Sequence, residues 1–255
     1  QAGVPADAMA AVALPVAHWG WPWRYRADVP MQPGSSMKLV TSIVALDVLG
    51  PGHRGHTELR SAASVEDGVL RGDLVLKGGA DPELGLPQLW ALLLDLRQAG
   101  VHTVEGRLVV DRTLFRPSRM DLGVPPFDES PEFAYNVIPD ALQLAGNLLP
   151  LELRADADGV RAGTVPPLDG IDISSRMRPT ATPCGDWRGD WQPAQVTAEA
   201  GRTRVELRGG FPQDCSVRAG LQLIDRQALT AAMFGTLWRG LGGRWSGVAV
   251  EAAAP

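Results

Sequence analysis

The chain has 255 residues, of which 45% are apolar and 21% are charged, so it can build a hydrophobic core and its composition is not that of a disordered chain. Its formal net charge of −5 provides no basic field to attract nucleic acid or an anionic membrane. No apolar run is long enough to span a bilayer, and the length suits two modest domains. No secretory signal is visible, and the chain starts at Gln1 rather than Met, which indicates a processed or trimmed product.

The opening segment, 9–29, is predicted to form two short strands around a turn at 20–23. Three tryptophans lie unusually close together here, Trp19, Trp21 and Trp23. We expect them to pack on this hairpin rather than to form an aromatic surface for a partner.

A helix is predicted from Ser35 to Leu49, after the connector 31–34 and before the stop signal at 50–52, which reads Gly-Pro-Gly. Its apolar residues cover too much of the circumference for a surface helix. We therefore expect it to be buried nearly all round. The residues concerned are Met37, Leu39, Val40, Ile43, Val44, Leu46, Val48 and Leu49.

The next segment mixes strands and a helix. Strands are predicted at 57–64 and 68–77, with a hairpin turn at 66–68. A helix is predicted at 87–99, because Pro87 suits its start and Gly100 its end, and a strand follows at 108–111. This order of elements indicates a compact α+β unit.

From about 132 to 213 the pattern changes to short strands separated by turn residues, which indicates a small all-β domain. The strands are predicted at 148–154, 170–174, 195–198 and 203–207. A helix at 225–241 and a strand at 245–251 end the chain.

Two cysteines, Cys184 and Cys215, lie far apart in the sequence. Two thiols without a neighbouring histidine cannot build a structural zinc site. They form either one disulfide, as in an oxidising compartment, or two unrelated buried thiols. The four histidines show no spacing typical of zinc hydrolases, so we expect no metal.

The clearest chemical motif is Ser35-Ser36-Met37-Lys38, an S-x-x-K arrangement at the start of a helix. Residues three apart share a helix face, so the hydroxyl of Ser35 and the amine of Lys38 can meet. A serine hydroxyl needs a base to become a good nucleophile, and a lysine can be that base where burial lowers its pKa. The alternative is that Ser35 only caps the helix, because S-x-x-K occurs roughly once by chance in a chain of this length.

The residues around the motif favour catalysis. Segment 31–41, MQPGSSMKLVT, resembles the active-site segment of D-alanyl-D-alanine carboxypeptidases, specifically the class C low-molecular-weight penicillin-binding proteins. The usual sequence there is M-N-P-A-S-T-M-K-L, so Gly34 and Ser36 are mild departures. Three further segments, 65–70, 72–76 and 78–82, are similar to the strand and glycine loop of that family's first inserted domain. Segment 135–142 is similar to the start of its second inserted domain.

The resemblance, which runs from about Met31 to the end of the chain, implies an α+β fold with nested domains. Residues 1–56 would begin a serine penicillin-recognising domain of the β-lactamase/transpeptidase type. Residues 57–134 and 218–251 would form the first inserted α+β domain, and 135–217 the second, mostly β. Both cysteines fall in the second insert, so the resemblance implies the disulfide Cys184–Cys215.

The resemblance also implies a function. Ser35 would be the nucleophile and Lys38 the general base of a carboxypeptidase and endopeptidase acting on peptidoglycan stem peptides in the periplasm. The acyl-enzyme needs no cofactor, and β-lactams would acylate the same serine. A homodimer is left open.

Two other elements of such an active site, S-x-N and K-T-G, are missing from the sequence. We therefore expect this chain alone to be inactive and its partner to be the C-terminal remainder of the peptidase domain. Two alternatives stay open: a β-lactamase or esterase using the same S-x-x-K, and a non-catalytic module that binds or scaffolds the cell wall.

Overall fold

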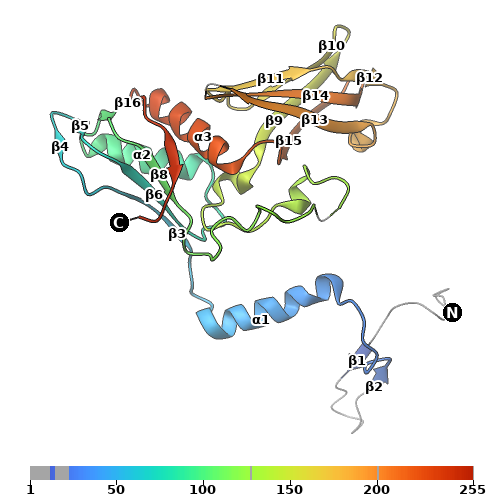
Figure 1. Cartoon of the computed structure of the whole chain (residues 1–255). Coiled ribbons are helices and arrows are strands. Elements are labelled where there is room, and N and C mark those ends of the chain that lie inside the picture. Colours follow the sequence, from blue (N-terminus) through green and yellow to red (C-terminus); the bar gives the residue numbers. More distant parts are fainter. Residues whose placement is uncertain (1–11, 15–22, 127, 200, 255) are drawn as a thin grey trace. The chain divides into compact units, whose positions relative to one another are not determined.

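The computed structural model describes residues 12–14, 23–126, 128–199 and 201–254. The chain divides into two compact units, Gln1–His53 and Arg54–Pro255 (Figure 1). None of the described helices is long and apolar enough to cross a bilayer.

The first unit holds a hairpin and one helix. β1 (Val12–Leu14) pairs antiparallel with β2 (Trp23–Tyr25), and α1 (Met37–Leu49) follows a single 3-10 turn, Gly34–Ser36. β2 is shorter than predicted because Arg26 adopts a positive φ of 48°, which breaks an extended strand. The turn was predicted at 20–23, but Trp23 already belongs to β2. Residues 20–22, Trp19 and the side chain of Trp23 lie outside the described residues.

A four-stranded sheet opens the second unit, in the order β17-β8-β6-β3. β6, β8 and β17 run parallel, and β3 is antiparallel to β6. Thus the last strand of the chain completes a sheet begun by residues nearly two hundred positions earlier. The strands are β3 (His56–Arg60), β6 (Leu74–Gly79), β8 (Leu108–Asp111) and β17 (Ala249–Glu251).

A smaller sheet has the order β16-β7-β5-β4. The predicted turn at 66–68 is confirmed: Asp67 and Gly68 have φ values of 48° and 77°, as a two-residue hairpin turn requires. The predicted strand 68–77 is divided between the two sheets, because the chain turns at 71–73, where Asp73 binds the backbone N–H and guanidinium of Arg107. The predicted strand 245–251 is likewise divided. The strands of this sheet are β4 (Val65–Glu66), β5 (Val69–Leu70), β7 (Thr103–Val104) and β16 (Arg244–Trp245).

Two helices accompany these sheets, α2 (Leu86–Gln98) and α3 (Arg226–Gly240), and both were predicted to within a residue at each end. Asp225 caps α3 by accepting a 2.8 Å hydrogen bond from the N–H of Gln227. The helices lie side by side, and α3 also packs on β16 and β17 (Figure 1). Their buried residues include Leu89, Leu93, Met233, Phe234 and Trp238.

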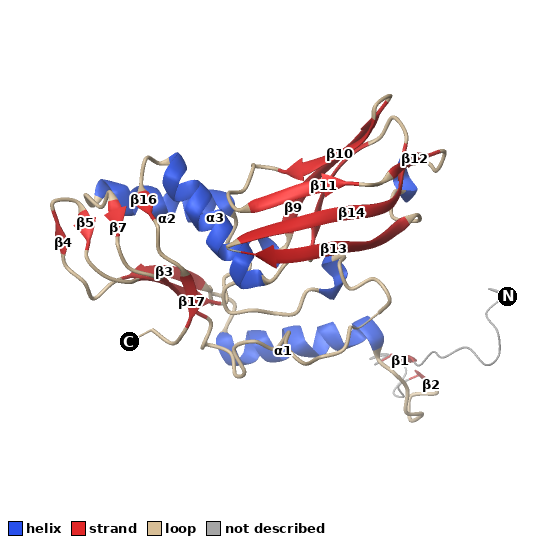
Figure 2. Ribbon diagram, turned by 45° about the horizontal axis from the view of Figure 1, so that its top comes forward, coloured by secondary structure: helices blue, strands red, loops and turns tan. Residues whose placement is uncertain are grey.

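The remaining strands form two stacked sheets, as predicted for an all-β segment (Figure 2). One has the antiparallel order β10-β9-β15, and in the other β14 pairs with β11, β12 and β13. Leu151, Leu153, Val205 and Leu207 are buried with an exposed fraction of 1% or less, so they form the core between the layers. The strands are β9 (Leu149–Asp156), β10 (Gly159–Thr164), β11 (Ile171–Ser175), β12 (Arg178–Thr180), β13 (Trp191–Glu199), β14 (Arg202–Pro212) and β15 (Ser216–Leu221). The whole fold is α+β.

Candidate active site

Ser35 and Lys38 meet at the start of the first helix. The Nζ of Lys38 donates a hydrogen bond of 3.1 Å to the Oγ of Ser35. The two side chains meet because one helical turn separates residues three apart. A free amine at this distance could take the hydroxyl proton, so the pair has the geometry of an activated serine nucleophile.

The backbone before Ser35 sets this geometry. Gly34 has a φ of 52°, a conformation that favours glycine, and with Pro33 it leads into the 3-10 turn. Ser35 lies inside this turn rather than at a cap position, and the residue that precedes α1 is Ser36. The interpretation of Ser35 as a simple N-cap is therefore wrong. Its backbone N–H lies at a helix start, where the N–H groups favour a developing negative charge.

The surroundings of the pair differ from the prediction. We expected the helix to be buried nearly all round, but none of its residues is buried among the described residues. Leu39, Ile43 and Val48 are 68%, 66% and 72% exposed. The prediction was wrong for this chain, because the other described secondary structure in its unit is only a 3-10 turn and a two-stranded hairpin. Lys38 is exposed too, whereas the prediction required its burial.

The predicted cysteine pair lies in the stacked sheets. Cys184 and Cys215 are bonded, with their Cα atoms 5.5 Å apart. The bond joins the 3-10 turn Cys184–Asp186 to the residue before β15. It therefore ties a surface loop to the core of the sheets, far along the chain from Ser35.

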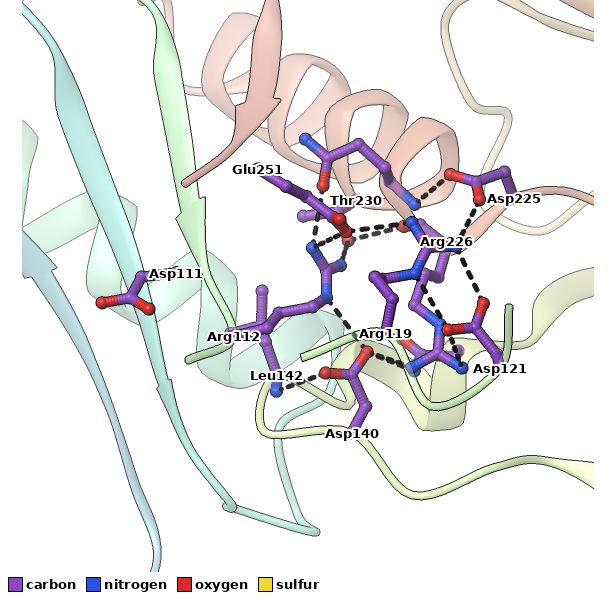
Figure 3. A network of polar contacts seen from close by, with 12 residues as sticks. Asp111, Arg112, Arg119, Asp121, Asp140, Leu142, Asp225, Arg226, Thr230 and Glu251 are labelled. Carbon is purple, nitrogen blue, oxygen red and sulfur yellow. Dashed lines mark hydrogen bonds and ion pairs between the residues drawn. The ribbon is translucent and has the colours of Figure 1, made fainter. Parts of the chain in front are cut away.

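A buried polar network, which the sequence did not reveal, lies at the start of α3 (Figure 3). Arg112 and Asp140 are fully enclosed, with side chains 1% and 0% exposed, and their ion pair is 3.0 Å long. Arg226 pairs with the same carboxylate at 2.7 Å, and Glu251 accepts from Arg112 at 2.8 Å. Asp140 also accepts a hydrogen bond from the N–H of Leu142, but its main partners are the two arginines.

The outer part of this network holds Arg119, Asp121 and Asp225. Burial by itself raises the pKa of Asp121, but hydrogen bonds from Arg119 and the charge of Arg226 outweigh it and hold the pKa below its ordinary value. Burial also opposes ionisation of Asp225, and again hydrogen bonds from Arg119 and from the N–H of Gln227 lower its pKa. The hydrogen bond with Asp121 raises the pKa of Arg119, against the effect of burial. The charged groups of this network already have partners, which favours a structural role.

Among the described residues there is no group of three or more histidine, cysteine or acidic side chains placed to hold a metal ion.

Comparison with known proteins places this chain in a family. Residues 4–255 match the sequence profile of the D-Ala-D-Ala carboxypeptidase 3 (S13) family. A D-alanyl-D-alanine carboxypeptidase of an Actinomadura species is 36% identical over 213 residues, which cover 78% of this chain and 37% of that protein. The D-alanyl-D-alanine carboxypeptidase DacB of Haemophilus influenzae is 29% identical over 132 residues, covering 52% of this chain and 27% of the relative.

Solved structures agree on the fold. Penicillin-binding protein 4 of Haemophilus influenzae superposes with a TM-score of 0.66 at 23% identity, covering 88% of this chain and 49% of that one. A structure of the same protein with a β-lactam gives a TM-score of 0.68 at 21% identity, covering 96% and 52%. The chain spans about half the length of these structures, and less of the curated relatives. Since the family profile matches nearly the whole sequence, the chain belongs to the D-Ala-D-Ala carboxypeptidase 3 (S13) family.

Proposed function

We propose that this chain is part of a parent protein that acts as a serine D-Ala-D-Ala carboxypeptidase and endopeptidase on peptidoglycan stem peptides. The observation that carries the proposal is the 3.1 Å hydrogen bond between Lys38 and Ser35 at a helix start. Membership of a carboxypeptidase family supports the reaction class. The proposed location is the periplasm, and a homodimer stays a prediction.

In the proposed reaction, Lys38 takes the proton of Ser35 while Oγ attacks the carbonyl carbon between the two D-alanines. The backbone N–H of Ser35 is one donor to the resulting oxyanion. The C–N bond then breaks, the leaving D-alanine receives the proton, and an ester to Ser35 remains. Water hydrolyses this ester, which restores the hydroxyl. Endopeptidase action would cleave a D-Ala–diaminopimelate cross-link in the same way.

β-Lactams are proposed to acylate the same oxygen. Attack of Ser35 on the lactam carbonyl opens the ring, and the ring nitrogen takes the proton. The β-lactam complex of penicillin-binding protein 4 from Haemophilus influenzae supports this ligand class for the fold.

We further propose that the C-terminal remainder of the parent protein completes the site. The sequence holds neither S-x-N nor K-T-G, so a second group to relay protons and an anchor for the substrate carboxylate are missing. The exposed apolar residues of α1 support the same proposal, since the remainder would cover them. This chain alone is therefore proposed to be inactive.

The nested division into 1–56, 57–134 with 218–251, and 135–217 also remains our proposal. Two observations support it. β17 pairs with β8, so the end of the chain joins the sheet of the first insert. The strands between 149 and 221 pair only with one another among the described strands.

Labelling of the parent protein with a fluorescent penicillin tests the function. We expect wild type and Ser36→Ala to take the label, and Ser35→Ala to take none. Ser36 is a matched control because it is the adjacent serine of the same motif. Equal labelling of Ser35→Ala and wild type contradicts the proposal. A label that is released quickly, without cleavage of a D-Ala-D-Ala peptide, indicates a β-lactamase. The absence of any label from wild type indicates a non-catalytic wall module.

A further inference from the structure

A groove of about 680 Å³ lies on the sheet centred on β14, over β12, β13 and β14. Its charged lining comprises Arg176, Arg178, Arg208, Asp190 and Glu206. The three arginines and two carboxylates leave one positive charge, in a chain whose net charge is −5. The groove therefore has a local charge opposite to that of the whole chain.

Two of the arginines are held in position by one carboxylate. Arg176 Nε lies 2.8 Å from one oxygen of Glu206, and Arg208 Nε lies 2.9 Å from the other. Glu206 is 22% exposed, whereas Arg176 is 76% exposed. The terminal nitrogens of Arg176 have no acceptor among the described residues, so they are available to a ligand.

Arg178 has the most guanidinium N–H groups available to a ligand in this groove. Its side chain is exposed, and this side chain makes no hydrogen bond or ion pair with any described residue. Asp190, the second carboxylate of the groove, accepts a hydrogen bond of 2.8 Å from the hydroxyl of Thr182. A guanidinium presents its N–H groups in a planar fork that matches a carboxylate.

Tight packing within β13 and β14 fixes the shape of the groove. Trp191 is one of its lining residues, and its ring packs against the hydrophobic core, at centroid distances of 6.0 Å from both Phe133 and Trp187. Gly209 also lines the groove; its φ is 98°, and a side-chain carbon there would lie 2.2 Å from the carbonyl oxygen of Asp190. The groove therefore lies on a sheet that is anchored to the core.

We propose that this groove binds peptidoglycan through a carboxylate of its stem peptide, with Arg176 and Arg178 as the recognising groups. This inference rests on the proposed function, which places the parent protein at the cell wall. A singly charged carboxylate suits the groove better than a phosphate polymer. The reason is that Glu206 and Asp190 lie in the same groove and repel dense negative charge. The groove would hold the parent protein on its polymer during successive cleavages.

Co-sedimentation of the parent protein with insoluble peptidoglycan, stripped of phosphate polymers by hydrofluoric acid, tests the proposal. We expect the double variant R176Q/R178Q to raise the apparent Kd roughly tenfold, because charge-assisted hydrogen bonds are lost. The matched control is R161Q/R218Q. These two arginines, in β10 and β15 of the other sheet, are 71% and 72% exposed, and each pairs with one carboxylate of that sheet. We expect this control to bind like wild type.

Thermal unfolding and penicillin labelling of both double variants should match wild type, which shows that the fold and Ser35 are intact. Converting the stem-peptide carboxyls to neutral amides should remove the difference between wild type and R176Q/R178Q. Equal binding of R176Q/R178Q and wild type to stripped peptidoglycan overturns the proposal. Binding that depends on these arginines only before stripping overturns it too, in favour of a phosphate polymer. A loss of binding in R176Q/R178Q without any labelling of wild type supports the groove while rejecting the proposed function.

Discussion

At the residue scale, the contact between Ser35 and Lys38 needs only one turn of helix. The 3.1 Å hydrogen bond follows from the spacing of three residues, which could be read from the sequence. The exposure of both side chains could not be read, since the sequence pattern of α1 predicts burial.

Lys38→Arg in the parent protein tests whether this amine acts as a base. Arginine keeps the positive charge, but it does not give up its proton at any working pH. We expect the rate of penicillin acylation to fall by about 10²- to 10⁴-fold. The other lysine of the chain, Lys77, is the matched control, and Lys77→Arg should leave the rate unchanged. A Lys38→Arg variant that acylates at the wild-type rate would limit the role of Lys38 to its charge.

The ion-pair partners of Asp140 could not be predicted from the sequence. Its carboxylate is fully enclosed between Arg112 and Arg226, which lie 28 residues before it and 86 residues after it. Asp140→Asn removes the one fully enclosed carboxylate that the two buried guanidinium groups share, and leaves Arg112 with Glu251 and Arg226 with Asp121. We expect the free energy of unfolding to fall by about 3–5 kcal/mol in urea titrations. Asp95→Asn, on the exposed side of α2, should change it by less than about 0.5 kcal/mol.

At the scale of elements, the disulfide fastens a 3-10 turn to β15. Cys184 and Cys215 are 31 residues apart, and closing a loop of this length restricts the unfolded chain. We expect the double variant C184S/C215S to be less stable by about 3–4 kcal/mol in urea. Reductant should lower the stability of wild type to the same level and leave the variant unaffected. A wild-type protein that is insensitive to reductant would contradict this.

The start of α3 should be sensitive to acid. The pKa values of Asp121 and Asp225 lie below their ordinary value of 3.8 in the folded state. Their ionised forms therefore contribute stability that is present above about pH 4, and this stability is lost as the pH falls through the folded pKa values. We expect the free energy of unfolding to decline below pH 4, and D121N/D225N to show a shallower decline. Asparagine still caps a helix, so the variant isolates the charge. An equal decline in both proteins would assign the acid sensitivity to other carboxylates.

On the scale of the whole molecule, we expect the burial of α1 to differ between this chain and the proposed parent protein. Ile43 is 66% exposed here, so Ile43→Asp should change the free energy of unfolding of this chain by less than about 0.5 kcal/mol. In the parent protein, where we propose that the C-terminal remainder covers the helix, the same change should cost about 3 kcal/mol or more and reduce penicillin labelling. Equal effects in both proteins would mean that the remainder does not cover this face.

The sequence alone was sufficient to predict the local features of the structure. It predicted α2, α3, the turn at 66–68, the β-rich segment and the meeting of Ser35 with Lys38, because each depends on residues close together along the chain. The division of strand 68–77 between two sheets, the addition of β17 beside β8, the network around Asp140 and the arginine groove needed the tertiary structure. These features join residues as far as 141 positions apart, as between Leu108 and Ala249. No local pattern records such a contact, because the packing of whole elements selects it.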